Sequence, residues 1–293
     1  MKEFDEFVKM IKAEKSIHTY ISYKKNLEVF MDALGIVTIE DMKNIKVADV
    51  RSHLDAQVDS GLKESSVNAE IRTLKAFVNW LVENSYIEVN PIAGLKLKKE
   101  AKTIATIVTK EERNAMIVSC KSLKMKLMIA LMFYAGLRRE EVVNVKLEDF
   151  NNGKLTIHGK GRKERVLAIH PYVLGLKDKY LEHRGNSYEY LFGTQQGFAG
   201  VGSGTWHKLS VDAVRASVKR SAELAGIAPE RIDKISPHTL RRTFACDLAK
   251  NGTGAFQIQK ALGHHDITTT QRYIAPAGAD IADDALMAQE SPE

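Results

Sequence analysis

The segment NNGKLTIHGKGRKERVLAI, residues 151–169, decides the fold class, because the spacing of apolar residues changes here from helical to extended. Leu155–His158 and Arg165–Ile169 are short runs of residue types that favour strands, and a glycine- and charge-rich turn over 159–164 joins them. Asn152-Gly153, just ahead of them, is a dipeptide typical of hairpin turns. Together these features predict a three-stranded antiparallel sheet.

Helical spacing of apolar residues prevails on both sides of this sheet. It predicts helices within 19–34, 47–58, 67–81, 127–134, 210–225 and 236–250. Ser65 and Ser66 are expected to cap the third of these, and Ser236 with Pro237 to begin the last. The glycine-rich stretch 193–204 lacks the Gly-Lys-Ser/Thr ending of a phosphate-binding loop, so we interpret it as a flexible surface loop.

Two signals divide the chain into domains. Asn90-Pro91 ends the first set of helices, because the residue before a proline is pushed out of helical geometry. Thr109-Lys110-Glu111-Glu112 has the capping-box form that begins a helix. We therefore expect a mainly α protein with a small antiparallel β-sheet. Its expected parts are an all-helical domain, a basic linker, an α+β domain and a tail, over residues 1–93, 94–106, 107–278 and 279–293.

Composition excludes several classes of protein. With 44% hydrophobic and 27% charged residues, the chain is not wholly disordered. Two cysteines cannot build a disulfide framework and no CxxC pair is present to hold zinc, which fits a reducing cytoplasm. The longest uncharged apolar run, 127–137, is too short to cross a bilayer, and the charged N-terminus is no signal peptide. A net charge of +6 favours polyanionic partners only weakly.

Four polar residues carry possible chemistry but also have ordinary interpretations. Arg138 follows an apolar helix whose C-terminus it could cap, and Lys160 lies at a hairpin tip where a lysine is commonly just solvated. His238 and Arg241 are three apart at a helix N-terminus, so both project from one face. That pair suits binding a phosphodiester and moving a proton, although a surface histidine beside a carboxylate-paired arginine is as compatible with the motif.

The last motif runs from Leu262-Gly-His-His to Tyr273. Gly263 is expected to end a helix, which places His264 just beyond it. The adjacent His264 and His265 would point in different directions and lack any HExxH or HxxxH partner, so we expect no metal. Tyr273 lies nine residues after His264, where a tyrosine by itself would be a packing residue.

The order of these motifs resembles the tyrosine recombinase (phage integrase) family, and most of all its compact Xer-type site-specific recombinases. The resemblance rests on Gly-Leu-Arg138, the hairpin Gly-Lys160-Gly, His238-x-x-Arg241, Leu-Gly-His264 and Tyr273, and it covers essentially the whole chain. It implies that residues 1–93 are a core-binding, SAM-like DNA-binding domain and that residues 107–278 are the catalytic domain.

The resemblance also implies a role for each residue. Arg138 and Arg241 would hold the scissile phosphate, Lys160 would be the mobile general acid, and Tyr273 would be the nucleophile. The histidines His238 and His264 would complete the pocket. Glu141 matches a carboxylate that orients or buffers Arg138 in the family, and Arg242 departs from it, since relatives often carry histidine there.

The implied activity is metal- and ATP-independent DNA strand transfer through a 3′-phosphotyrosyl intermediate, with no cofactor. In an Xer-like role the enzyme would resolve chromosome dimers in the cytoplasm, associated with DNA. The alternatives are a compact viral or mobile-element integrase and a DNA-binding protein that does not cleave. A type IB topoisomerase shares related chemistry but would not need a subunit-linking tail.

Implied partners are double-stranded DNA and further copies of the chain, in a tetramer on two synapsed sites, with no membrane. Residues 280–293 carry five acidic residues and no basic one, and the resemblance implies that this tail forms a subunit-linking helix rather than a frayed end. On the 67–81 helix, Arg72, Lys75 and Asn79 lie opposite the apolar stripe. This face is either a DNA-contacting surface or merely a solvated one.

Overall fold

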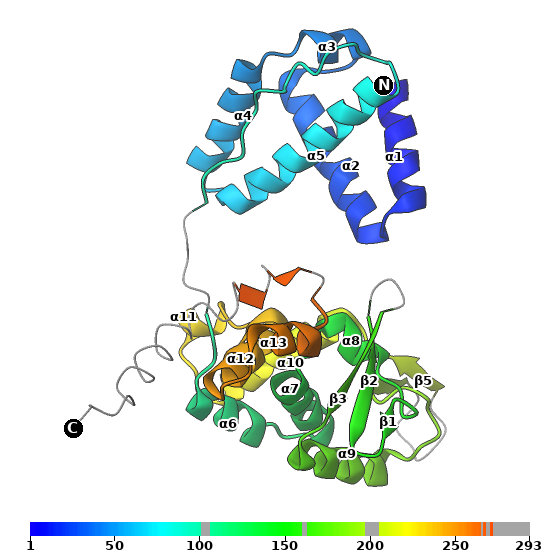
Figure 1. The fold of residues 1–293 in the computed structure, drawn as a ribbon, viewed down its shortest axis with the longest axis vertical. Helices are drawn as coiled ribbons and strands as arrows, with labels where there is room; N and C mark the ends of the chain where they lie inside the picture. The colour runs from blue at the N-terminus through cyan, green and yellow to red at the C-terminus, as the bar shows by residue number, and fades with distance from the viewer. Residues whose placement is uncertain (101–105, 160–162, 197–204, 265, 268–269, 272–293) are drawn as a thin grey trace, which may run out of the picture. The chain divides into compact units, whose positions relative to one another are not determined.

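The computed structural model divides into two compact units, Met1–Thr103 and Ile104–Glu293 (Figure 1). It describes residues 1–100, 106–159, 163–196, 205–264, 266–267 and 270–271. Lys160, Tyr273 and the predicted tail over 279–293 therefore lie outside the described residues. In the part of the chain that is described, no helix is both long and apolar enough to cross a membrane.

The first unit is all-helical in its described residues, as the sequence predicted. Its helices are α1 (Lys2–Glu14), α2 (Ile17–Leu34), α3 (Ile39–Asn44), α4 (Val47–Asp59) and α5 (Glu64–Glu83). Helix α5 buries Ile71, Leu74 and Phe77 at helical spacing, because one apolar face packs against the other helices. The predicted caps are wrong, since Lys63 is the N-cap and Ser65 and Ser66 fall inside the first turn.

The segment that follows α5 packs against the first unit as far as residue 100. The Asn68 side chain is 1% exposed, so its amide must find partners within the protein. Its Nδ2 donates to the Lys98 carbonyl at 3.0 Å and to Glu100 Oε1 at 2.7 Å, and its Oδ1 accepts from the Lys98 amide at 2.7 Å. Lys98 also pairs with Asp55. Half of the predicted basic linker is therefore held on α5.

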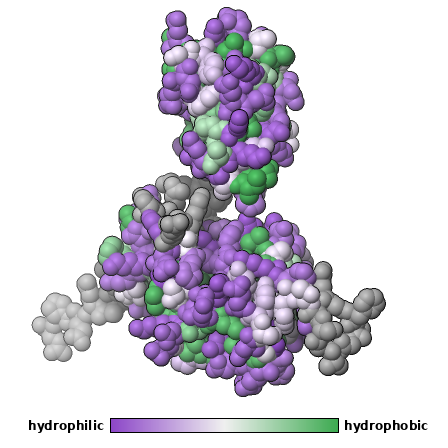
Figure 2. Space-filling model, turned by 90° about the vertical axis from the view of Figure 1, so that its right-hand side faces the viewer, coloured by the Kyte–Doolittle hydropathy of each residue, from purple (hydrophilic) through white to green (hydrophobic). Residues whose placement is uncertain are grey.

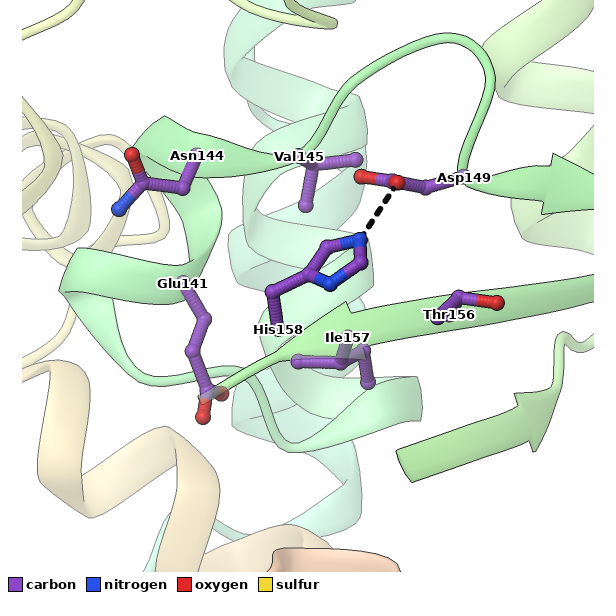
Figure 3. A pocket seen from close by; sticks show the side chains of 7 residues that line it. All are labelled: Glu141, Asn144, Val145, Asp149, Thr156, Ile157 and His158. Carbon is purple, nitrogen blue, oxygen red and sulfur yellow. Dashed lines mark hydrogen bonds and ion pairs between the residues drawn. The ribbon is translucent and has the colours of Figure 1, made fainter. Parts of the chain in front are cut away.

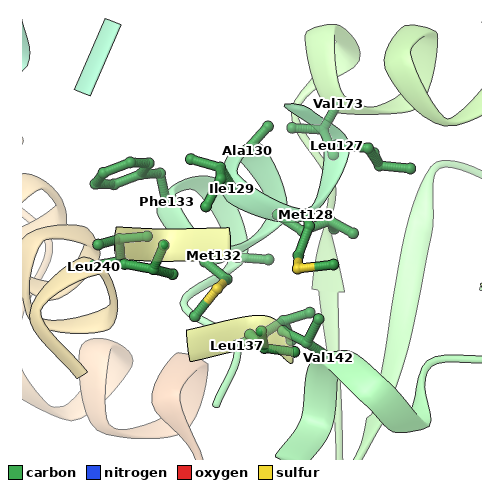
Figure 4. Close-up of a cluster of buried hydrophobic side chains, with 14 of the residues drawn as sticks. Leu127, Met128, Ile129, Ala130, Met132, Phe133, Leu137, Val142, Val173 and Leu240 are labelled. Carbon is green, nitrogen blue, oxygen red and sulfur yellow. The ribbon is translucent and has the colours of Figure 1, made fainter. Parts of the chain in front are cut away.

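The second unit is built around one apolar helix. Helix α7 (Leu123–Ala135) buries every residue from Leu127 to Phe133, and Figure 4 shows most of these side chains in one cluster with Leu137, Val142 and Leu240. A helix that is apolar on all sides is stable only when surrounded, which explains its central place. The others are α6 (Lys110–Val118), α8 (Arg139–Asn144), α9 (Pro171–Arg184), α10 (Val211–Leu224), α11 (Pro229–Ile232), α12 (Pro237–Lys250) and α13 (Ala255–Leu262).

The predicted three-stranded antiparallel sheet is present. Strands β1 (Phe150–Asn151), β2 (Lys154–His158) and β3 (Glu164–Ala168) lie in the order β1-β2-β3, with Asn152-Gly153 forming the first turn. The register pairs Leu155 with Leu167 and His158 with Glu164. The turn that carries Lys160 therefore connects His158 to Glu164, the paired ends of two strands.

The interpretation of 193–204 as a loop is wrong at its start. Gly193–Gln196 forms strand β4, which pairs in antiparallel fashion with β5 (Thr205–Lys208). Trp206 of β5 stacks on Tyr188 with ring centroids 5.5 Å apart. This aromatic packing comes from outside the stretch, so its polar sequence did not indicate a strand. Figure 2 shows a mainly hydrophilic surface with scattered apolar patches, consistent with apolar residues gathered in a core within each unit.

Gly136 is a position where only glycine fits. It ends α7 in the left-handed region at φ 58°, and a Cβ there would overlap the Phe244 ring. We expect Gly136→Ala to lower the free energy of unfolding of the second unit by about 3 kcal/mol, because left-handed strain and overpacking add. Gly226→Ala, at φ 71° with open space around it, is expected to cost about 1 kcal/mol in the same urea titration. Equal losses would show that the packing argument is wrong.

Candidate active site

A single buried carboxylate organises the candidate site. Glu141 of α8 is 5% exposed and accepts hydrogen bonds from the Arg138 amide at 2.8 Å and from Arg138 Nη1 at 2.7 Å. Arg165 of β3 donates to both of its oxygens at 2.8 Å, and Arg241 Nη1 lies 3.6 Å away. Burial raises the pKa of Glu141, but the hydrogen bonds and charges of these arginines lower it to about 2. Glu141 is therefore ionised and holds three arginines together.

Arg241 lies at the bottom of this cluster. Its side chain is 1% exposed, because α12 directs it into the unit from one turn beyond the helix start. Its guanidinium donates to the Gly136 carbonyl at 2.6 Å and to the Leu262 carbonyl. The ends of α7 and α13 therefore meet on one side chain, which fixes the orientation of its planar fork.

Arg138 lies at the rim. Its side chain is 31% exposed, and Nη2 donates to the Gly263 carbonyl at 3.3 Å. Gly136 ends α7 in the left-handed conformation, so Arg138 does not cap that helix and is instead the N-cap residue of α8. The expected contact between Glu141 and Arg138 is confirmed, and the structure brings together Arg138 and Arg241, which are 103 positions apart in the sequence.

The two histidines flank the arginines. His264 follows Gly263, which ends α13 at φ 64° as predicted, and its Nδ1 makes a hydrogen bond of 2.9 Å with Thr270 Oγ1. Burial and the charges of the nearby arginines lower the pKa of His264 to about 4. Desolvation and the charge of Arg241 also lower the pKa of His238, on the first turn of α12. His264 is therefore neutral at pH 7, and it can donate or accept a hydrogen bond without adding a positive charge.

The strand ends that flank the Lys160 segment lie close to Glu141. His158, the last residue of β2, pairs with Asp149 and Glu164, each at 2.9 Å. The bond to Asp149, with smaller contributions from Glu164, raises the pKa of His158 despite partial desolvation. Figure 3 shows this histidine and Glu141 lining one small cavity of about 10 Å³, roughly the room for one water. The hairpin base is thus fixed by ion pairs beside the carboxylate.

Arg165 is the site residue that the sequence analysis missed. It was interpreted only as part of a strand, yet it is 10% exposed and its guanidinium binds both oxygens of Glu141 at 2.8 Å. A signal was available, because residues alternate between the two faces of a strand. Leu167 shares the inward face with Arg165, whereas Val166 is 58% exposed. An arginine at an inward position needs a buried anion, and Glu141 supplies it.

Within the described ranges, no group of three or more His, Cys, Asp or Glu side chains has an arrangement that would hold a metal ion. Cys120 and Cys246 are both buried thiols. Lys160 and Tyr273 lie outside the described residues, so the structure does not place them against the cluster.

Comparison with known proteins assigns the family. The phage integrase family matches residues 98–279, and the N-terminal SAM-like domain of phage integrases matches residues 4–85. Tyrosine recombinase XerD of Rickettsia bellii (strain RML369-C) is 28% identical over 297 residues, covering 93% of each chain.

Two solved structures have the same fold. XerH site-specific recombinase bound to palindromic difH substrate matches 98% of this chain and 84% of its own, with 20% identity and a TM-score of 0.75. A lambda integrase tetramer bound to a Holliday junction matches 91% of this chain and 77% of its own, with 19% identity and a TM-score of 0.72. The chain therefore belongs to the phage integrase family. It is a site-specific tyrosine recombinase, an enzyme that cleaves and rejoins DNA.

Proposed function

We propose that Arg138 and Arg241 hold the scissile phosphate of DNA and that Tyr273 attacks it. The observation that carries this proposal is the pair of arginines fixed around the buried Glu141 carboxylate, with His264 beside them. A phosphodiester gains negative charge in its pentacoordinate transition state. Guanidinium groups that are already oriented stabilise that charge without reorganisation.

The proposed chemistry needs no ATP, metal or cofactor. A tyrosine hydroxyl has a pKa of about 10, so that of Tyr273 becomes nucleophilic only when nearby cations lower the cost of ionisation and a base takes its proton. Attack forms the bond from the Tyr273 oxygen to phosphorus and breaks the bond to the 5′-oxygen, which Lys160 protonates. General acid catalysis of this kind contributes roughly 10²–10⁴-fold. The covalent ester keeps the bond energy, so a second 5′-hydroxyl can reverse the step on a new strand.

Covalent trapping tests this assignment. The protein is incubated with fragmented host DNA, denatured, and assayed for adducts that resist SDS, with Tyr273→Phe in parallel. Adducts in the wild type alone support the nucleophile. DNA binding without any adduct would favour the alternative of a DNA-binding protein that does not cleave.

The proposed cellular role is resolution of chromosome dimers, in the cytoplasm and on DNA. It is supported by the relative named XerD, which matches over 93% of both chains. The alternative, a compact viral or mobile-element integrase, is favoured by the likeness to lambda integrase. Sequencing the DNA attached to Tyr273 separates the two roles, because one predicts a single chromosomal site and the other the ends of a mobile element.

We also propose that the enzyme works as a tetramer on two synapsed sites and that residues 279–293 link the subunits. The lambda integrase tetramer supports the assembly, and the acidic, partly apolar sequence of the tail supports the link. Deleting residues 279–293 is expected to abolish strand exchange between sites while binding to a single site survives. Unchanged exchange would refute the link.

The face of α5 that carries Arg72, Lys75 and Asn79 is proposed to contact DNA. Arg72 and Asn79 are exposed, and the Arg72 side chain lies 3.9 Å from Glu100, a weak pair that a phosphate can displace. We expect Arg72→Ala with Lys75→Ala to weaken DNA binding and to reduce the salt slope of log K by about 2, one for each phosphate contact. Lys43→Ala, which removes an exposed lysine paired with Glu40, is the control. An unchanged slope in the double variant would show a merely solvated face.

A further inference from the structure

Arg165 has no role in the chemistry proposed so far, although its guanidinium binds both oxygens of the buried Glu141 carboxylate. It lies on β3, five residues after Lys160, opposite Ile157 of β2. Both of its terminal nitrogens bind Glu141, one to each oxygen, at 2.8 Å. The ion pair therefore joins the Lys160 hairpin to the helix that begins at Arg139.

The Arg165 side chain also lies under the turn that carries His264. A Cβ on Gly263 would lie 3.3 Å from Arg165 Cδ and 3.3 Å from its Nη1, so the glycine backbone packs closely over the guanidinium. The positive charge of Arg165 is one of those that lower the pKa of His264. The same side chain thus contacts the hairpin, the carboxylate and the α13 turn.

We propose that Arg165 is a positioning residue, which saturates Glu141 so that the guanidinium groups of Arg138 and Arg241 stay directed at the phosphate. This inference rests on the proposed function and adds to it the residue that connects the general-acid hairpin to the phosphate pocket.

The charges on the cluster give the mechanism. Glu141 has two oxygens, and the Arg165 guanidinium binds both. Arg138 Nη1 shares one of them, the Arg138 amide shares the other, and Arg241 stays 3.6 Å away. Without Arg165, the buried carboxylate is balanced only by Arg138 and Arg241 and draws their donors toward itself. A displacement of about 1 Å in a positioned catalytic group is enough for a loss of about 10²-fold in rate.

The test uses the whole chain of 293 residues, with fragmented genomic DNA as the probe. The initial rate of adduct formation and the affinity for the same DNA are measured for Arg165→Leu, Arg165→Lys, Glu141→Gln and the double variant Arg165→Leu/Glu141→Gln. Arg220→Leu is the matched control, because Arg220 forms an exposed pair with Glu223. Circular dichroism establishes which variants are folded.

The expected pattern separates positioning from a structural role. Arg165→Leu is expected to lower the adduct rate about 10²-fold with little change in DNA affinity. Arg165→Lys is expected to react about tenfold faster than Arg165→Leu and about tenfold more slowly than the wild type. The double variant is expected to be faster than Arg165→Leu alone, because it removes the competing carboxylate charge. If Arg165→Leu does not fold, the adduct rates of Arg165→Lys and of the double variant are compared with the wild-type rate instead.

Three results would overturn the inference. The first is an adduct rate in folded Arg165 variants equal to that of the Arg220→Leu control. The second is a loss in the double variant equal to the product of the single losses. The third, no adduct in the wild type, overturns the proposed function and this inference with it.

Discussion

Arg241→Ala is expected to form the covalent DNA adduct about 10³-fold more slowly than the wild type. The guanidinium is 1% exposed and is fixed by the Gly136 and Leu262 carbonyls, so its planar fork is already oriented when the phosphate arrives. Removing one donor of such a preorganised site costs about 10²–10³-fold, and an arginine that binds in two-point fashion supplies more than one. The measurement is the initial rate of SDS-resistant adduct on fragmented DNA.

Arg241→Lys is the informative companion to that variant. It keeps the positive charge but has no planar fork to bridge the two carbonyls and Glu141, so its rate is expected to lie closer to Arg241→Ala than to the wild type. Arg220→Ala, on the exposed surface of α10, is the matched control and is expected to react at the wild-type rate. A wild-type rate in Arg241→Ala would contradict the assignment of this arginine to the phosphate.

Glu141→Leu is expected to lower the free energy of unfolding of the second unit by about 3–5 kcal/mol. The substitution removes the shared partner of Arg138, Arg165 and Arg241 and leaves positive charge uncompensated in a buried place. Glu140→Leu removes the neighbouring carboxylate, which is 54% exposed and paired with Arg139, and is expected to cost under about 1 kcal/mol. Urea unfolding of both variants measures the difference, and similar losses would rule out the central role of Glu141.

Because the pKa of Glu141 is lowered on folding, we expect the free energy of unfolding of the second unit to depend on pH. The pKa of Glu141 is lowered from 4.5 to about 2 in the folded protein. Its contribution is therefore fully present above the unfolded pKa and is lost as the pH falls from about 4.5 through about 2. The difference in unfolding free energy between the wild type and Glu141→Leu should shrink over that interval. A difference that stays constant down to pH 2 would contradict the depressed pKa.

Local sequence signals predicted the elements well where the elements are stabilised locally. Asn152-Gly153 fixed the first turn of the sheet because both residues adopt positive φ, and the apolar run around Leu127 marked the central helix. Strand β4 was missed because its stability depends on pairing with β5 and on Trp206 stacking over Tyr188. The packing of residues 95–100 on α5 was missed for the same reason, since it depends on the buried Asn68 amide.

The candidate site shows the same division. Helical spacing was enough to place His238 near Arg241 at the start of α12, where the charge of Arg241 contributes to lowering the pKa of His238. No local pattern could bring Arg138 next to Gly263, because that contact depends on how α7, α8 and α13 pack, and nothing in the sequence analysis anticipated it. The family resemblance implied only that Arg138 and Arg241 act together. Arg165 was missed because the strand was interpreted by residue type and not by face.

Locating the DNA on the protein tests the central claim most directly. The adduct recovered from fragmented host DNA is digested with nuclease and protease, and mass spectrometry identifies the modified peptide. We expect one nucleotide linked through its 3′-phosphate to Tyr273. A nucleotide on any other residue, or DNA cleaved with no protein attached, would contradict the account.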